Sequence, residues 1–377
     1  MTETFAIIAG GGTAGHVVPG LAIANELVSR GVDIDAIHYV GSERGIETRL
    51  VPDAGFALTV LPGRGIQRRI TAENLRSLWG LVRAVWQGIK LVRRLRPSVV
   101  VGLGGYASVP CVVGAVVGRV PIVVAEQNAV PGAANRLAGR FAKACAVSFA
   151  GTALPRATWT GNPVRREVLD AVKVDRADAR SRLGVPLDRT MIAIFGGSLG
   201  ARRINYAVRD ALPHWVERPD LAVRHVAGTR DYDELTVSCA LPANPVLNYE
   251  LIEYENDMAT VYAAADLIVC RAGASSVAEL AVMGAPAILV PLPGAPGDHQ
   301  TANGRALEAA GAAVVVVDSD LDGETLVATV DELLGDPDRL GEMARGGATV
   351  ARPDAAAAVV DLIEQHRRTP ISNGATR

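Results

Sequence analysis

Residues 265–303 read ADLIVCRAGASSVAELAVMGAPAILVPLPGAPGDHQTAN, and this stretch decides the fold more than any other part of the chain. It predicts a buried strand beginning near Leu267, a small-residue turn, a helix that opens on Ser275 and Ser276, and a second strand at 287–290. A strand that runs through a glycine turn into a helix directs free N–H groups and a positive helix dipole at one point, which suits a phosphate group. Acidic and amide side chains flank that point, so the stretch predicts a site for a sugar nucleotide.

The composition is typical of an α/β enzyme. The chain has 377 residues, of which 49% are hydrophobic and 21% charged, and its formal net charge is −2. This length suffices for two domains, and the near-neutral charge gives no sign of a nucleic-acid partner. The cysteines are scattered without a CxxC pair, which favours buried thiols over disulfides or a metal site. We expect no signal peptide, because no basic segment precedes the first predicted strand. We expect no membrane span, because the longest apolar region, 109–125, is broken by Pro110, Arg119 and Pro121.

Short β-branched runs alternate with longer helical patterns along the chain. Strands are predicted at 5–9, 36–41, 99–102, 121–125, 144–148, 191–195, 222–227, 266–269, 287–290 and 313–317. Helices are predicted at 18–30, 74–95, 107–117, 201–212, 274–283, 299–310, 323–334 and about 354–368.

This βαβα rhythm predicts parallel sheets covered on both faces, and it occurs twice, with a break near residues 160–164. We therefore expect an α/β fold of two doubly wound Rossmann-like domains that face each other across a cleft. The N-terminal domain is expected to span 1–163, completed by a C-terminal helix within 351–377. The C-terminal domain is expected to span 164–350.

The first glycine loop follows the first predicted strand. Gly10, Gly12 and Gly15 satisfy the dinucleotide-binding fingerprint, but that fingerprint also needs an acid closing the second strand, and the nearest acid, Glu43, lies beyond the turn. A nicotinamide cofactor is therefore weakly supported. His16 follows the glycines, where a helix dipole lowers the pKa of an imidazole and leaves it able to accept a proton. The alternative is a helix-start residue hydrogen-bonded to the backbone.

A second glycine loop, Gly196–Gly200, follows the first strand of the second half. Ser198 either donates to a phosphate oxygen or caps a plain turn. In the sugar-nucleotide stretch, Ser276 and Glu279 have capping-box spacing, so Glu279 either folds back onto its own helix or accepts from two ribose hydroxyls. Residues 298–300 and Asn303 favour the ribose role, because polar groups converge there.

Two further positions in the second half leave alternatives open. Arg271 closes the predicted strand and either neutralises phosphate or pairs with an acid that holds the turn. The segment 253–258 either offers its backbone to a flat base, with Tyr254 alongside, or is an ordinary charged surface loop.

A basic amphipathic helix is predicted in the first half. Between Arg64 and Arg96 the only acid is Glu73, and the same segment carries Trp79 and Trp86 at helical spacing. The basic residues are Arg64, Arg68, Arg69, Arg76, Arg83, Lys90, Arg93, Arg94 and Arg96. Such a helix suits an anionic bilayer surface. The alternative is a cover helix whose apolar stripe faces the sheet and whose arginines are solvated.

Seven motifs in this order and spacing give the chain a specific resemblance. They are Gly10–His16, Gly104–Pro110, Glu126–Asn128, Gly161–Arg165, Gly196–Arg202 with Asn205, Arg271–Glu279, and Asp298–Gln300. Over nearly its whole length the chain resembles the MurG family of bacterial transferases in glycosyltransferase family 28. The resemblance implies the GT-B fold, with no cofactor and no tightly bound metal.

The resemblance also implies roles for individual residues. In the second domain, UDP-N-acetylglucosamine (UDP-GlcNAc) would be held by Glu279 at the ribose, the backbone around Glu255 at the uracil, Ser275 and Ser276 at the diphosphate, and Gln300 at the sugar. The donor contacts that the resemblance implies also include Thr13, Gly15, Asn128, Arg165 and Ser198. The first domain would receive undecaprenyl-linked lipid I, with His16 and Asn128 near its reacting hydroxyl. One departure is the small, glycine-rich loop Gly294–Gly297 before Asp298.

The reaction implied is inverting transfer of GlcNAc to the C4 hydroxyl of the muramyl sugar, which gives the β1→4 link of lipid II in peptidoglycan synthesis. His16 is the expected base and Glu126 its rival. The expected location is peripheral, on the cytoplasmic face of the bacterial membrane. The alternatives are a GT-B transferase with another lipid or natural-product acceptor, a nicotinamide-linked oxidoreductase, and one half of a split transferase that only recruits a partner.

Overall fold

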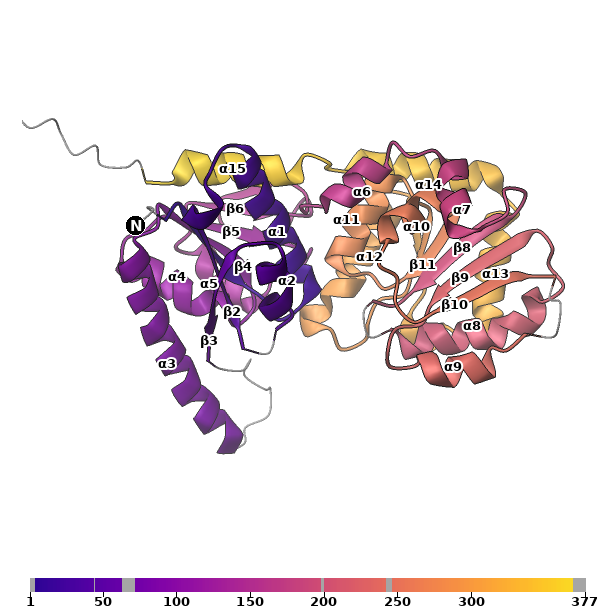
Figure 1. Cartoon of the computed structure of the whole chain (residues 1–377), viewed down its shortest axis with the longest axis horizontal. Helices are drawn as coiled ribbons and strands as arrows, with labels where there is room; N and C mark the ends of the chain where they lie inside the picture. The colour runs from indigo at the N-terminus through magenta and orange to yellow at the C-terminus, as the bar shows by residue number, and fades with distance from the viewer. Residues whose placement is uncertain (1–3, 44, 63–71, 198–199, 242–245, 369–377) are drawn as a thin grey trace, which may run out of the picture. The chain divides into compact units, whose positions relative to one another are not determined.

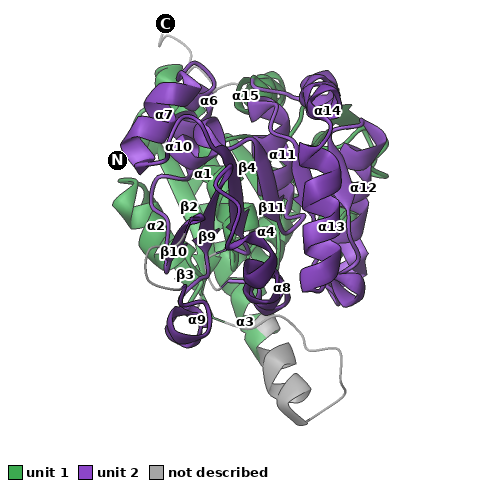
Figure 2. Cartoon of the chain, turned by 90° about the vertical axis from the view of Figure 1, so that its right-hand side faces the viewer, with its two compact units in different colours: residues 1–164, 354–377 green, residues 165–353 purple. Residues whose placement is uncertain are grey.

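The computed structural model describes residues 4–43, 45–62, 72–197, 200–241 and 246–368, and for 72–79 and 81 it describes the backbone only. The chain forms two units, each built around its own parallel sheet. The first unit contains residues 1–164 and 354–377, and the second contains residues 165–353 (Figure 2).

The sheet of the first unit has seven strands in the order β3-β2-β1-β4-β5-β6-β7, and its pairs are parallel. The strands are β1 (Ala6–Gly10), β2 (Ile37–Ser42), β3 (Ala57–Leu61), β4 (Val99–Gly104), β5 (Ile122–Glu126), β6 (Ala144–Val147) and β7 (Ala157–Trp159). The helices are α1 (Ala14–Ser29), α2 (Glu47–Asp53), α3 (Ala72–Leu95), α4 (Ser108–Val117), α5 (Ala133–Gly139) and α15 (Ala355–His366). A 3-10 turn lies at Ile34–Ala36.

Both faces of this sheet are buried, as the apolar run of β1 predicts. Successive side chains of a strand point to opposite faces, so Ile8 packs in a core with Val359 of α15, whereas Ile7 packs in a second core with Leu91 of α3. Figure 1 shows α1 and α15 on one side of the sheet and α3 and α4 on the other.

The sheet of the second unit has six strands in the order β10-β9-β8-β11-β12-β13, and its pairs are also parallel. The strands are β8 (Thr190–Phe195), β9 (Leu221–Val226), β10 (Asn248–Ile252), β11 (Leu267–Cys270), β12 (Ala287–Leu289) and β13 (Ala313–Val315). The helices are α6 (Arg166–Ala171), α7 (Arg176–Leu183), α8 (Arg202–Trp215), α9 (Tyr232–Ser238), α10 (Met258–Ala264), α11 (Ala274–Met283), α12 (His299–Ala309), α13 (Gly323–Leu334) and α14 (Pro337–Val350). Further 3-10 turns lie at Pro296–Asp298 and Asp318–Asp320.

In each sheet the strand order reverses beside the first strand. β1 lies between β2 and β4, and β8 lies between β9 and β11. Doubly wound sheets bind ligands beyond the carboxyl ends of the strands at this switch point. The glycine loops that follow β1, β4 and β8, and the turn that follows β11, therefore lie where this fold binds its ligands.

Helix α1 begins earlier than the pattern predicts. The prediction was a helix over 18–30, but the observed helix begins at Ala14 and continues through Pro19. A proline inside a helix removes one backbone hydrogen bond, and here the helix continues beyond it. As a result, His16 lies in the first turn of α1.

The C-terminal helix α15 belongs to the first unit, where it packs against α1. Arg30, just after α1, donates to the backbone carbonyl of Ala357 at 3.1 Å and forms ion pairs with Asp361 at 2.6 Å and Glu364 at 3.1 Å. Val359 and Ile363 of α15 are fully buried. Apolar burial and a multidentate arginine thus fix this helix to the first sheet.

Candidate functional site

Helix α11 starts at the carboxyl end of β11, and among the described residues no side chain caps its first N–H groups. Its N-cap is Gly273, and no side-chain capping bond forms. Ser275 and Ser276 lie in the first turn, and the Oγ atom of Ser275 is buried with no hydrogen-bond partner within the described ranges. Free N–H groups at a helix start attract anions. This turn is therefore a candidate site for a phosphate group.

Glu279 is buried on α11, and both of its carboxylate oxygens are already bound. Arg165 donates to Oε1 at 2.8 Å, and the hydroxyl of Tyr262 donates to Oε2 at 2.9 Å. The capping-box alternative is therefore wrong, because α11 starts at Ala274 and the Glu279 carboxylate turns away from the helix start. Burial and the nearby Glu279 carboxylate raise the pKa of Tyr262 well above its usual value, which keeps its hydroxyl protonated as a donor.

Arg271 pairs with an acid, which was one of its two predicted roles. Its guanidinium donates to the carbonyls of Val290 and Pro291 and forms a 2.5 Å ion pair with Asp318. Arg271 thereby ties the end of β11 to the segments that follow β12 and β13. Its Nε–H is buried and has no partner among the described residues.

The residues expected around the base and the sugar lie on loops with defined contacts. Glu255, between β10 and α10, forms a 2.7 Å ion pair with Arg224 and accepts from the backbone N–H of Asp257. Gln300, in the first turn of α12, accepts from the backbone N–H of Leu292 through Oε1 at 3.0 Å. Asn303 is fully buried and donates to the carbonyl of Ala272 at 3.2 Å, which supports the β11–α11 turn from below.

The loop after β8 is held by a buried polar network. A side chain at Gly200 would meet the carbonyl oxygen of Ala227 at 1.9 Å, so this position needs glycine. Asn205 of α8 donates to that same carbonyl at 2.9 Å and lies 3.1 Å from Nε2 of His225. Burial lowers the pKa of His225 to about 4, so this imidazole is neutral at pH 7. Ser198 lies outside the described residues.

At the switch point of the first unit, His16 lies between two glycine loops. Its Nδ1 is 3.1 Å from the hydroxyl of Thr13, and a Cβ placed on Gly104 would lie 3.3 Å from its Nε2. Gly15 precedes His16 in the first turn of α1, and no side chain caps that turn. Thr13, Gly15 and His16 thus lie beside the loop that follows β4.

Glu126, at the end of β5, is buried and bound on both oxygens. Its Oε1 accepts from the backbone and side-chain N–H groups of Asn128 at 3.0 and 3.2 Å. Its Oε2 accepts from the backbone N–H of Gly132 at 3.0 Å and from the side chain of Asn135 at 2.9 Å. Glu126 therefore organises the loop that carries Asn128.

Three buried polar residues near these switch points were not predicted from the sequence: Glu47, His225 and Tyr262. Glu47 binds the first glycine loop across 35 residues of sequence, and Tyr262 binds Glu279 across 17. Each looks ordinary in its own segment, as a helix-start acid or an apolar-run aromatic. For Glu47 the sequence did carry one signal: the nearby Gly41 and Gly45 have no side chains that would collide with the buried Glu47 side chain.

Helix α3 presents a basic and apolar surface. The side chain of Trp86 is 57% exposed and that of Val82 56%, and Lys90 Nζ lies 3.4 Å from the centre of the Trp86 ring. Arg64, Arg68 and Arg69 lie outside the described residues, as do the side chains of Arg76 and Trp79. Within the described ranges, no helix combines the length and the apolar character that crossing a bilayer requires.

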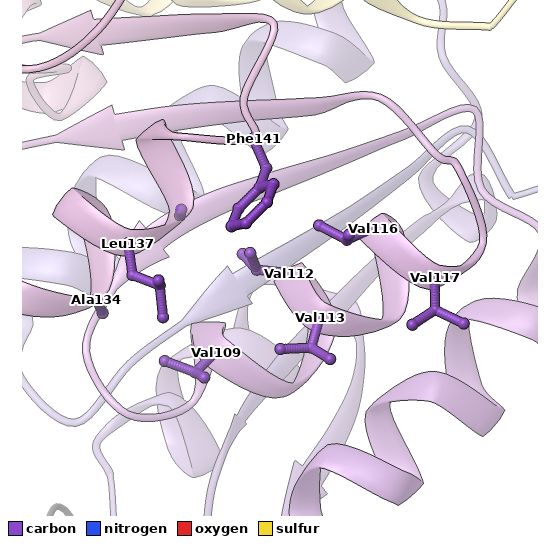
Figure 3. A pocket seen from close by; sticks show the side chains of 9 residues that line it. Val109, Val112, Val113, Val116, Val117, Ala134, Leu137 and Phe141 are labelled. Carbon is purple, nitrogen blue, oxygen red and sulfur yellow. The ribbon is translucent and has the colours of Figure 1, made fainter.

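An apolar hollow lies between α4 and α5. It is lined by Val109, Val112, Val113, Val116 and Val117 of α4, by Ala134, Leu137 and Ala138 of α5, and by Phe141. Figure 3 shows these side chains facing one another across the hollow. Phe141 and Leu137 are exposed at 55% and 45%, which is unusual for clustered large apolar side chains.

Two family models match the chain. The glycosyltransferase family 28 N-terminal domain matches residues 6–147, and the C-terminal domain of the same family matches residues 191–359.

Relatives match over the full length. A UDP-N-acetylglucosamine–N-acetylmuramyl-(pentapeptide) pyrophosphoryl-undecaprenol N-acetylglucosamine transferase of Desulforudis audaxviator is 40% identical, covering 95% of this chain and 97% of its own. The protein of that name from an Anaeromyxobacter species is 41% identical, covering 94% and 92%. Among solved structures, Acinetobacter baumannii MurG is 32% identical with a TM-score of 0.76, covering 96% and 99%. A Neisseria meningitidis UDP-GlcNAc 2-epimerase, 12% identical with a TM-score of 0.66 and coverage of 96% and 99%, shares the fold alone.

Proposed function

The chain belongs to glycosyltransferase family 28, and we propose that it is the hexosyltransferase that moves GlcNAc from UDP-GlcNAc to the C4 hydroxyl of the muramyl sugar of lipid I. The product would be lipid II with a β1→4 link, an intermediate of peptidoglycan synthesis. The observation that carries this proposal is the end-to-end match, at 40% identity over 95% of the chain, to a relative named for that transfer. The two Rossmann-like units agree with the GT-B fold of this family.

In the second unit, we propose that the first turn of α11 binds the diphosphate of the donor. The free helix N–H groups and the unpaired Ser275 hydroxyl support this role, and Ser276 and Ser198 would add further donors. Negative charge develops on the diphosphate as the glycosidic bond breaks. Preorganised N–H groups and a helix dipole stabilise such charge in place of a cation.

We propose that Glu279 accepts from the ribose hydroxyls. Each carboxylate oxygen has about two lone-pair sites, and Arg165 and Tyr262 use one on each oxygen. The two protein donors thereby aim the carboxylate and leave acceptor capacity for a ligand. The backbone near Glu255 would hold the uracil. The oxygen of Gln300 accepts from the Leu292 N–H, and its NH₂ group would donate to a sugar oxygen of the donor.

In the first unit, His16 is the base that we propose takes the proton from the C4 hydroxyl. Glu126 is the weaker rival, because four N–H groups already bind its two oxygens and hold it as a structural anion. General-base help is typically worth about 10² to 10⁴ in rate. Asn128, Thr13 and Gly15 would contact the substrates beside His16.

We propose that the protein docks peripherally on an anionic membrane, at the cytoplasmic face where a nucleotide-sugar donor is available. Exposed Trp86 and Val82 on α3, with the basic residues of that helix, support this docking. Each basic residue near an anionic leaflet contributes about 1 kcal/mol of binding free energy. The exposed apolar hollow between α4 and α5 adds apolar surface to the same unit.

The test is transfer by the purified chain. Radiolabelled UDP-GlcNAc is incubated with a short-chain lipid I analogue in buffer containing EDTA, and the product is digested and identified by NMR. We expect a β1→4 disaccharide, and no product with diacylglycerol or glycosylated natural-product acceptors. Transfer to one of those acceptors, with none to lipid I, would support the rival GT-B transferase instead.

A further inference from the structure

Glu47 is a fully buried carboxylate that binds the backbone of the first glycine loop. Its Oε2 accepts from the backbone N–H of Gly12 at 2.8 Å. Its Oε1 accepts from the backbone N–H of Ser42 at 2.7 Å and from the Ser42 hydroxyl at 2.9 Å. One side chain at the start of α2 therefore joins the loop after β1 to the end of β2.

Three positions around the Glu47 carboxylate must be glycine, because any side chain there would collide with Glu47. An added Cβ would lie 2.2 Å from Oε1 of Glu47 at Gly11, 2.3 Å from its Cγ at Gly41, and 1.9 Å from its Oε2 at Gly45. The contact at Gly11 and Gly45 is with the buried head of the side chain, which is held by three hydrogen bonds and has little freedom to move. These glycines thus make room for an internal anion.

This arrangement changes the interpretation of the glycine fingerprint. In a phosphate-binding loop, the backbone N–H groups after the first strand point at the ligand. Here the Gly12 N–H is occupied by a carboxylate of the protein itself. The loop after β1 therefore has a fixed internal partner, whereas the first turn of α11 in the second unit has none within the described residues.

The held loop leads directly to His16. Thr13 follows Gly12 and is the N-cap of α1, and its hydroxyl lies 3.1 Å from Nδ1 of His16. On the other side, Gly104 approaches Nε2 of the imidazole closely. A shift of Gly12 would move Thr13 and change the orientation of the ring.

We propose that Glu47 is a positioning residue for His16: it occupies the anion position of the first glycine loop and thereby fixes the Thr13–His16 pair. This inference rests on the proposed role of His16 as the base. Glu47 is fully buried and its carboxylate accepts from groups of the protein itself, so its loss should lower kcat and leave UDP binding by the second unit unchanged. A misplacement of about 1 Å at a reacting group costs about 10²-fold in rate, which sets the expected scale.

The experiment is a double-mutant cycle of Glu47→Gln and His16→Ala, measured as kcat for transfer to the lipid I analogue. Gln keeps the shape of the side chain but turns an NH₂ group toward one of the loop donors, so one loop contact is lost. We expect Glu47→Gln to lower kcat at least about tenfold, with UDP affinity in calorimetry unchanged. In the His16→Ala background the same change should cost less than about twofold, because both residues act through one step.

The inference would be overturned if the two changes lowered kcat in the double variant by the product of their separate factors. Wild-type turnover by Glu47→Gln would overturn it too. Wild-type turnover by His16→Ala would overturn it as well, along with the base assignment. A wild-type chain that binds UDP-GlcNAc but transfers nothing would instead count against the proposed function.

Two further variants keep the test decisive. Should Glu47→Gln fail to fold, Ser42→Ala removes only the hydroxyl contact to Oε1, and it should lower kcat in the same direction by a smaller factor that also disappears in the His16→Ala background. The matched control is Glu26→Gln. Glu26 lies on α1, the helix that carries His16, but it pairs with Arg30 at the opposite end of that helix. The Glu26→Gln change should therefore leave kcat within about twofold.

Discussion

Tyr262 shows how a single buried hydroxyl prepares the candidate donor site. Replacing it with Phe removes the bond to Oε2 of Glu279 without changing the ring. A hydrogen bond to a charged group contributes about 1.5–3 kcal/mol. Without it the Glu279 carboxylate is less well oriented, and part of this free energy is lost from ribose binding. We expect Tyr262→Phe to weaken UDP binding about fivefold in calorimetry, and to leave the binding of a 2′,3′-dideoxyribose analogue nearly unchanged.

The matched control is Tyr206→Phe in the same unit. It removes a similar hydroxyl–carboxylate bond, to Glu234 at 3.2 Å, on the exposed side of α8. Equal weakening of both ligands by Tyr262→Phe would mean that the effect is a general loss of structure rather than loss of the ribose contact.

His225 predicts a pH dependence of stability. Its folded-state pKa is lowered to about 4 by burial, so the unfolded chain binds more protons than the folded chain between pH 6.5 and 4. Stability from this residue is therefore fully present above pH 6.5 and is lost as the pH falls through that window. The loss between pH 7 and 5 is about 2 kcal/mol.

Urea unfolding of the second unit at pH 7 and pH 5 measures this effect. His38, in the first unit, also has a lowered pKa, so the comparison requires a His225→Gln variant. Gln keeps a hydrogen-bonding head between Tyr249 and Asn205 and does not titrate. An equally large loss in the variant would show that other groups cause the pH dependence.

At the scale of the element, the exposed tryptophan of α3 is the feature to test. We expect Trp86→Ala to weaken binding to vesicles containing anionic lipid roughly tenfold, because burial of a large apolar side chain is worth about 1.5–3 kcal/mol. Co-sedimentation measures this, and added salt should weaken the wild-type protein further. Trp159→Ala, at an exposed tryptophan on the edge strand β7, is the control. The same loss in both variants would contradict a docking role for α3.

The sequence predicted the buried central strands and the long helices other than α14, because these carry strong apolar periodicity. It missed β3, β7 and β10, whose side chains are largely half-buried or exposed because they lie toward the edges of the sheets. The short helices α2, α5, α6, α7 and α9 were missed as well, since six to eight residues carry too little periodicity to stand out.

The residues of the candidate site also fall into those that the sequence could predict and those that it could not. Positions fixed by local geometry, such as Ser275 at the start of α11, followed from the strand–turn–helix pattern. Partners fixed by tertiary structure did not, because Arg165 and Glu279 are 114 residues apart and meet only in the fold.

At the scale of the molecule, the chain returns from the second unit to the first, and α15 packs there against α1. Arg30→Ala removes the contacts to Asp361, Glu364 and the Ala357 carbonyl, and should speed hydrogen exchange in α15 by about threefold to tenfold. Mass spectrometry of peptides from 355–366 measures this. Arg166→Ala, which breaks one exposed pair with Asp170, should leave α15 unchanged. Unchanged exchange in the Arg30 variant would show that apolar packing alone holds the helix.

The central claim is that the second unit binds the donor through helix N–H groups and amides. A crystal structure of the full chain soaked with UDP-GlcNAc in EDTA tests it most directly. We predict the diphosphate within hydrogen-bond distance of Ser275 and Ser276, with the ribose hydroxyls on Glu279. A diphosphate bound instead on the loop after β1, or one that binds only with an added divalent cation, would contradict the account.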